Sequence, residues 1–205
     1  MQANEPVPLK MQRKARAAEL LARAFHNDPT YRFVLPDEDR RGQMLLWLFD
    51  RVVRYSVLYG EAHTTPSVEG VACWLSPGET HLALGRLMRS GLYGTPLKMG
   101  WAAYRRFASY RSYADGLHKL YAPDLHWYLW AVGVSPPSQG RGIGGMLLEP
   151  VLTRASADGV ACYLETGEER NIRFYEKHGF KVAGEGTMPE KGVKVWAMLR
   201  DGTGG

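Results

Sequence analysis

Residues 127–145, WYLWAVGVSPPSQGRGIGG, constrain the fold of this chain more than any other stretch. They begin with a near-continuous apolar run to Val134, which is typical of a strand buried on both faces. The next residues include two prolines and cannot continue a strand, because proline lacks the backbone donor. Four glycines then precede a helical pattern. Uncovered amide N–H groups at a helix start attract anions, so we expect a phosphate-bearing ligand.

The glycines fit two templates. Residues 140–145 satisfy G-x-G-x-x-G, and Glu165 lies where a dinucleotide-binding fold has its ribose-binding acid. Against this template, the loop 135–139 separates the strand from the first glycine, and little chain follows Gly145 for a doubly wound domain. The other template is Gln139-x-x-Gly142-x-Gly144. A third interpretation is a flexible turn without a ligand.

Periodicity and turn residues predict one α/β domain over residues 1–205, with a disordered tail at about 201–205. The expected helices and strands alternate along the chain, and the Asp28-Pro29 pair is expected to end the first helix. The predicted helical segments are 13–25, a second beginning at 37–39, 80–115 with an interruption near 91–96, 143–158 and 171–178. The predicted strands are 58–64, 70–75, 127–134, 160–165, 180–182 and 193–199.

A second motif follows the glycine-rich turn. Asn171 and Tyr175 are four residues apart on a predicted helix, so their polar ends share one face. Together with QGRGIG, this N-x-x-x-Y pattern and the following Gly179-Phe180 resemble the GCN5-related N-acetyltransferase (GNAT) family across residues 126–182. The phrases VGVSPxxQGxG and RNxxFYExxGF look most like the branch that contains puromycin N-acetyltransferase.

The resemblance implies a GNAT acyl-CoA fold. Its sheet would be mixed and mostly antiparallel, with about six or seven strands, flanking helices and a splayed central pair. The implied reaction is direct acetyl transfer from acetyl-CoA to the primary amine of a small molecule. Tyr175 would protonate the departing thiolate. The residues implied in cofactor binding are Val132, Val134, Gln139, Gly140, Arg141, Gly142, Ile143, Gly144, Gly145 and Asn171.

The resemblance does not identify the general base. Some family members carry a carboxylate on the central strand, where this chain has Tyr128. Glu165 is the first candidate base and Asp28 the second, and either carboxylate has the charge to bind a cationic acceptor instead. Asp28 and Tyr128 are therefore predicted substrate-binding residues. The aromatic and basic segment 80–115 is either a wall of the acceptor cavity or an amphipathic layer on the sheet.

Composition and charge limit the kinds of ligand and partner that this chain is expected to bind. The net charge of +5 suits an anionic ligand such as CoA, and the basic residues form no nucleic-acid motif. The apolar runs are too short to span a bilayer, so no membrane partner is expected, and a cytoplasmic location is the default. Cys73 and Cys162 lie in apolar runs as core thiols, and the histidines lack metal-ligand spacing, so no metal is expected. A homodimer is compatible with the resemblance.

Other functions remain open at this point. One is a CoA-binding sensor, or a silent relative that kept the cofactor turn. Another is acetylation of protein amino groups, although the bulky segment 80–115 favours an enclosed small-molecule pocket. Tyr175 favours an active enzyme over a sensor, because a proton donor is of no use without turnover.

Overall fold

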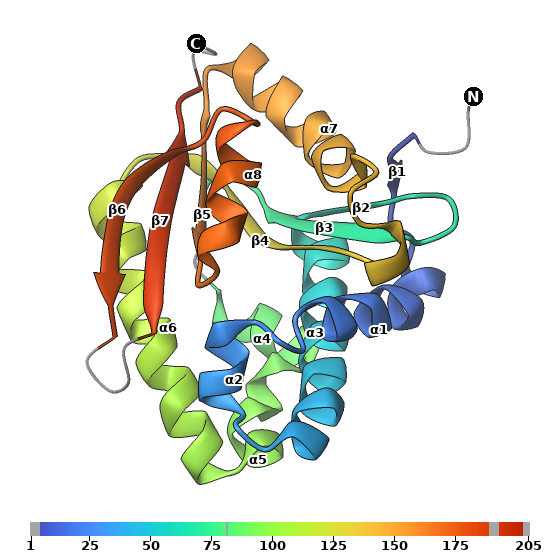
Figure 1. The fold of residues 1–205 in the computed structure, drawn as a ribbon, viewed down its shortest axis with the longest axis vertical. Coiled ribbons are helices and arrows are strands. Elements are labelled where there is room, and N and C mark those ends of the chain that lie inside the picture. The colour runs from blue at the N-terminus through green and yellow to red at the C-terminus, as the bar shows by residue number, and fades with distance from the viewer. Residues whose placement is uncertain (1–4, 81, 189–192, 203–205) are drawn as a thin grey trace.

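The computed structural model describes residues 5–80, 82–188 and 193–202. These residues form one seven-stranded sheet in the order β1-β2-β3-β4-β5-β7-β6, with helices on its two faces (Figure 1). The strands are β1 Val7–Pro8, β2 Glu61–Thr64, β3 Gly70–Leu75, β4 His126–Val134, β5 Ala161–Thr166, β6 Lys181–Thr187 and β7 Lys194–Arg200. Only β4 and β5 pair in parallel; the other neighbouring strands are antiparallel.

The two central strands separate along their length. β4 pairs with β5 only from His126 to Tyr128, although β4 continues to Val134. On its other side β4 stays paired with β3 to its end, through the Val134–Gly70 pair. The second half of β4 therefore has no strand partner on the β5 side. This confirms the expected mixed, mostly antiparallel sheet with a splayed central pair.

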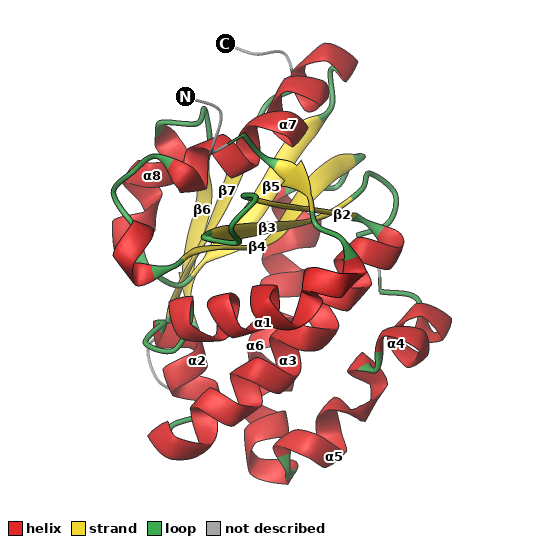
Figure 2. Cartoon of the chain, turned by 90° about the vertical axis from the view of Figure 1, so that its right-hand side faces the viewer, coloured by secondary structure: helices red, strands yellow, loops and turns green. Residues whose placement is uncertain are grey.

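The helices form a layer on each face of the sheet (Figure 2). One core, around Leu21, Phe49 and Tyr163, lies under α1, α3 and α6, and the other, around Leu148 and Leu164, lies under α7. The helices are α1 Lys14–Ala24, α2 Pro29–Val34, α3 Glu38–Tyr59, α4 Leu84–Ser90, α5 Thr95–Met99, α6 Trp101–Tyr121, α7 Ile143–Asp158 and α8 Ile172–Glu176. Short 3₁₀ turns lie at Met11–Arg13, Leu92–Gly94, Pro136–Ser138 and Glu169–Asn171.

Local sequence explains most of these boundaries. Asp37 caps α3, because its carboxylate accepts from the backbone N–H of Arg40 at 3.1 Å. Gly159 ends α7 in the left-handed conformation, with φ of 67°. α6 runs on to Tyr121 instead of ending at 115, because Pro123 is the first residue beyond it that excludes a helix.

One helix was not predicted, and one strand begins later than predicted. Asp28-Pro29 ends the first helix but also begins α2, since Pro29 occupies its first turn and Asp28 caps it. The strand predicted from residue 58 begins only at Glu61, because α3 continues to Tyr59. Of the predicted disordered tail, residues 203–205 lie outside the described part of the chain, and Gly202 is buried.

Gly60, which follows the last residue of α3, packs closely against β3. A Cβ placed on Gly60 would lie 2.2 Å from the carbonyl oxygen of Trp74, which is backbone of the neighbouring strand and has little room to move. We expect Gly60→Ala to lower the free energy of unfolding by roughly 2–3 kcal/mol in urea denaturation. Gly116→Ala is the matched control, because a Cβ there meets nothing within 4 Å and alanine favours the helix. Equal stability of the two variants would contradict this account.

Both cysteines are free and buried, as the sequence predicts. Burial raises the pKa of the Cys73 and Cys162 thiols to about 12, so neither is a ready nucleophile. Among the described residues no helix is long and apolar enough to cross a membrane.

Candidate functional site

The glycine-rich turn joins the splayed end of β4 to α7. Gly140 and Gly142 have φ of 75° and 77°, a conformation that other residues rarely adopt. A Cβ at either position would meet no atom within 4 Å, so the space above the turn is open. α7 begins directly after Gly142, and its first amide groups lack partners within the helix. The turn therefore presents backbone donors and the positive end of a helix dipole to an anionic group.

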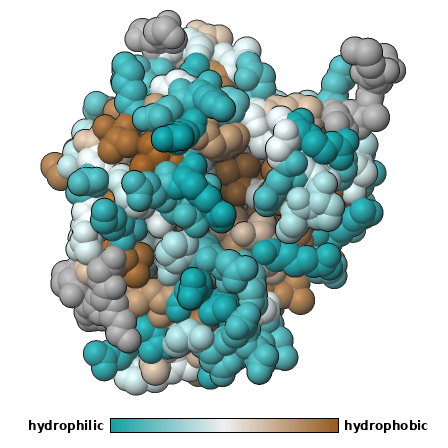
Figure 3. Space-filling view, viewed as in Figure 1, coloured by the Kyte–Doolittle hydropathy of each residue, from teal (hydrophilic) through white to brown (hydrophobic). Residues whose placement is uncertain are grey.

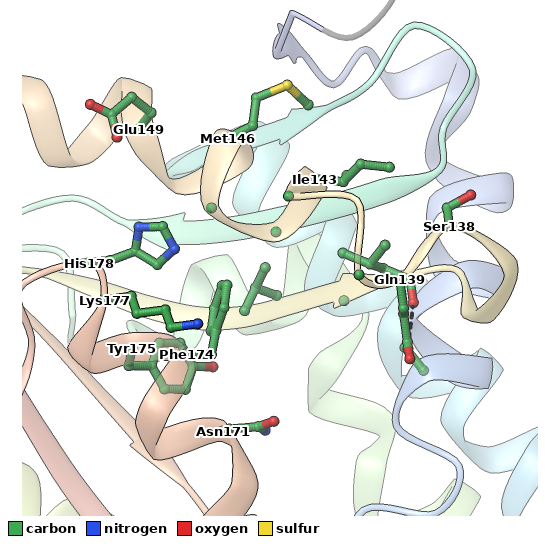
Figure 4. Close-up of a pocket in the computed structure, with 18 of the residues that line it drawn as sticks. Ser138, Gln139, Ile143, Met146, Glu149, Asn171, Phe174, Tyr175, Lys177 and His178 are labelled. Carbon is green, nitrogen blue, oxygen red and sulfur yellow. Dashed lines mark hydrogen bonds between the residues drawn. The ribbon is translucent and has the colours of Figure 1, made fainter.

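The next two glycines let α8 pack against the start of α7. A Cβ on Gly144 would lie 3.1 Å from the Phe174 ring, and one on Gly145 would lie 2.3 Å from the His178 ring. Larger residues would force these rings away. The close packing brings Asn171 and Tyr175 beside the turn (Figure 4).

Glu69 ties the loop after β4 to the turn between β2 and β3. Its carboxylate accepts from the Ser138 hydroxyl at 2.9 Å and pairs with Arg141 at 3.2 Å. Hydrogen bonds from Ser67 and Ser138 lower the pKa of Glu69 below its ordinary value. Gln139 donates from Nε2 to the Val134 carbonyl at 3.1 Å and closes the loop. The side chain of Arg141, a residue that the resemblance implies in cofactor binding, thus holds the loop.

A cavity of about 1150 Å³ lies where β4 and β5 separate, and most of the predicted site residues line it. Figure 3 shows a recess with hydrophobic surface in this region. The predicted residues that line it are Asp28, Val132, Val134, Gln139, Gly140, Gly142, Ile143, Gly144, Gly145, Asn171 and Tyr175. Three predicted residues, Tyr128, Arg141 and Glu165, are not among the described residues that line it.

Asp28 enters the cavity because it caps α2. Its Oδ1 accepts from the Thr30 N–H at 2.9 Å, which fixes the carboxylate at the end of α1. Burial raises the pKa of Asp28, and the nearby Glu168 charge adds to the rise, while the hydrogen bonds from Thr30 oppose it. A carboxylate with a raised pKa is a stronger base than an exposed one.

Tyr175 is the other titratable group at the cavity. Its side chain is 7% exposed. Burial raises the pKa of Tyr175 above its ordinary value, and the charge of Asp28 raises it further. The phenol therefore keeps its proton at neutral pH. A protonated phenol and a basic carboxylate at one cavity are the two groups that acid–base chemistry needs.

Glu165 lies in a different environment. The Tyr128 hydroxyl donates to its carboxylate at 2.7 Å, and His118 of α6 lies 3.8 Å away. The carboxylate is 4% exposed. Burial raises the pKa of Glu165 to about 7, although the Tyr128 hydrogen bond and the Arg111 charge lower it. The structure thus places the first candidate base among polar side chains under α6.

This buried carboxyl predicts a pH-dependent stability. The folded state holds the Glu165 proton up to about pH 7, whereas the unfolded carboxyl releases it near pH 4.5. The free energy of unfolding should therefore fall by on the order of 3 kcal/mol as pH rises between these values. We expect Glu165→Gln to remove most of that fall in urea denaturation across this range. The exposed Glu176→Gln is the control and should keep it; the same slope in both variants would refute the assignment.

Several cavity residues were not predicted. Phe25, Glu168, Arg170, Phe174 and His178 line the cavity. His178 continues the helical spacing of Asn171 and Tyr175, which is a signal that the sequence contains. Glu168 and Phe25 come from separate loops and carry no such signal. Among the described residues, no group of three His, Cys, Asp or Glu side chains has metal-site geometry.

The site fits an acyl-CoA. The open turn at Gly140 and Gly142 has unobstructed space for a pyrophosphate, and the unpaired second half of β4 offers main-chain groups to an extended arm. The dinucleotide-binding template does not fit this site, because Glu165, which would be its ribose-binding acid, is not among the described residues that line the cavity.

Comparison with known proteins agrees with this geometry. Residues 99–180 match the acetyltransferase (GNAT) family model. An uncharacterized N-acetyltransferase of Schizosaccharomyces pombe is 28% identical over 173 residues, which cover 80% of this chain and 69% of the relative.

Solved structures share the fold. A histone acetyltransferase HPA2 and related acetyltransferase from Corynebacterium glutamicum superimposes with a TM-score of 0.67 at 22% identity, covering 97% of this chain and 96% of the other. Arylalkylamine N-acetyltransferase 2 from Aedes aegypti superimposes with a TM-score of 0.61 at 13% identity, covering 96% and 98%. The family match over residues 99–180, the splayed sheet and the open glycine turn agree: this chain has the GNAT fold and is similar to acyl-CoA-dependent N-acetyltransferases.

Proposed function

We propose that this enzyme transfers the acetyl group of acetyl-CoA directly to the primary amine of a small molecule, with Tyr175 as general acid and Asp28 as general base. The supporting observation is that Asp28, Tyr175 and the open glycine turn line one cavity. An acid, a base and a place for the cofactor phosphates are then within reach of one bound pair of substrates.

The cofactor would lie along the splay. Backbone amides of residues 141–145 would hold the pyrophosphate, and Asn171 would contact the arm from α8. Main-chain groups at Val132 and Val134 would pair with the pantetheine arm as an added strand. When bound, acetyl-CoA supplies the acetyl group as a thioester.

The residues around the thioester then move two protons. The acceptor enters as an ammonium ion and gives one proton to Asp28, since an amine with a pKa near 10 is mostly protonated at neutral pH. Its nitrogen forms the new C–N bond while the C–S bond breaks, and the second proton that the nitrogen must lose passes to water. Tyr175 gives its proton to the departing sulfur, and a proton carried by Asp28 or by water restores the phenol. The unpaired edge of β4 would stabilise charge on the acetyl oxygen.

The acceptor should be a cationic amine with an apolar body. Asp28 and Glu168 bring negative charge to the cavity, and Phe25 adds an aromatic surface beside them. One structural neighbour is named for arylalkylamines, which have this character. The branch resemblance makes an aminonucleoside such as puromycin a first compound to test. We propose Asp28, not Glu165, as the base because Asp28 reaches the cavity.

A panel of amines tests the proposal. We would incubate the enzyme with acetyl-CoA and arylalkylamines, diamines, aminonucleosides or peptides with free amino groups, and follow thiol release. We expect small primary amines to give thiol release together with an N-acetylated product. Acetylation of peptides alone would contradict the small-molecule proposal. Acetyl-CoA binding without turnover for any amine would indicate a sensor.

A further inference from the structure

The helical segment between β3 and the middle of α6 has an exposed apolar surface. Among the residues that the structure describes, seven large hydrophobic side chains are more than 60% exposed. Five of the seven fall within a short stretch of chain: Leu84, Met88, Tyr93, Leu97 and Trp101. Such a concentration is unusual on a surface with no partner, where exposed apolar residues are normally scattered. We call these five residues and the cations described next the α4–α6 patch.

The charged side chains of this segment are basic. Residues 80–114 contain six basic residues and no acidic one. Three of the six are engaged elsewhere: Arg86 pairs with Glu79, Arg111 pairs with Asp115, and Arg106 donates to the Val34 carbonyl. The other three, Arg89, Lys98 and Arg105, are exposed and form no ion pair within the described residues. The α4–α6 patch therefore combines apolar side chains with three available cations.

The patch lies away from the cofactor cavity. α4 and α5 are in the lower half of the molecule, whereas α7 and α8 are in its upper half (Figures 1 and 2). The start of α3 borders it, because Arg40 of that helix donates to the Met99 carbonyl at 3.0 Å. A partner bound to the patch would leave the cavity open to substrates.

We propose that the α4–α6 patch binds the surface of a bilayer that contains anionic phospholipid. Leucine and methionine would enter the acyl boundary, Tyr93 and Trp101 would lie at the headgroup level, and the cations would meet the lipid charge. A second copy of the chain fits poorly, because a symmetric dimer on this face would bring its cations together. The inference departs from the sequence-based expectation of no membrane partner.

Vesicle sedimentation with the full chain tests the proposal. We expect binding to vesicles of phosphatidylcholine mixed with phosphatidylserine, weak binding to phosphatidylcholine alone, and loss of binding in high salt. The double variant Leu97→Ser/Trp101→Ser should bind at least about tenfold more weakly. The triple variant Arg89→Gln/Lys98→Gln/Arg105→Gln should lose on the order of 100-fold, at about one factor of five for each cation.

Matched controls separate the patch from general surface effects. Leu120→Ser/Leu125→Ser changes two side chains of 67% and 68% exposure outside the patch. Leu120 lies about 28 Å from Trp101 along α6, at 1.5 Å per residue. This variant should bind vesicles as the wild type does, and thermal melts should show that all the variants fold.

Four results would overturn the proposal. They are no binding to anionic vesicles, equal binding to both vesicle types, equal loss in the Leu120→Ser/Leu125→Ser control, and equally tight binding to a soluble acidic polypeptide. Light scattering adds a fifth, a wild-type dimer that Leu97→Ser/Trp101→Ser dissociates, which would assign the patch to a second copy.

Discussion

Tyr175→Phe is expected to lower turnover with acetyl-CoA and an acceptor amine by roughly 10²–10³-fold. The change removes one hydroxyl from a buried ring and leaves its packing against Phe174 and Phe180 in place. The pKa of Tyr175 is raised by burial and by Asp28, so the wild-type phenol is protonated across the working range. Steady-state kinetics would measure the loss, and the affinity for acetyl-CoA by calorimetry should change little.

The pH dependence of this variant identifies the role. At higher pH the departing sulfur leaves as a thiolate without needing a proton, so the deficit of Tyr175→Phe should shrink there. Tyr55→Phe is a suitable control, since Tyr55 is a fully buried residue of α3 and does not line the cavity. A Tyr175→Phe enzyme with wild-type turnover would show that the thiolate leaves without this donor.

Asp28→Asn should lower kcat/KM for a cationic amine by roughly 10²–10⁴-fold. The amide has the shape of the carboxylate but neither its charge nor its basicity. Because asparagine is also a good helix cap, it should still accept from the Thr30 N–H and keep α2 in place. In the wild type the raised pKa of Asp28 should appear as a rise of kcat/KM with pH. The variant should lack that rise.

Asp37→Asn is the matched control for this change. Asp37 also caps a helix through its carboxylate, at 3.1 Å from the Arg40 N–H, and does not line the cavity. It should keep wild-type kinetics. A small effect of Asp28→Asn together with a large loss in Glu165→Gln would move the base to Glu165 and show that substrates reach the space under α6.

The fold was predictable where local signals are unambiguous. The apolar run of β4, the prolines after it and Gly159 place the strand, the turn and α7 correctly. Errors arose where one signal has two meanings. Asp28-Pro29 ends one helix and begins the next, and the apolar residues before Gly60 suit a strand as well as a helix. Tertiary packing decides between such alternatives.

The residues of the candidate site likewise include some that belong to local motifs and others whose position depends on long-range packing. The glycine turn, Asn171 and Tyr175 belong to contiguous motifs, and the structure brings them to one cavity. Glu165 could not be placed from spacing alone, because its surroundings depend on where β4 and β5 separate. Its alternation with Leu164 contained a partial signal: Tyr163 and Glu165 share one face of β5, and Tyr163 belongs to the core under α6.

Initial-rate kinetics with acetyl-CoA and the best amine varied together test the central claim most directly. If both substrates meet in the one cavity and the acetyl group passes directly between them, double-reciprocal lines should intersect, and mass spectrometry should find no acetylated enzyme when the amine is omitted. Parallel lines together with a covalent acetyl-enzyme would contradict direct transfer.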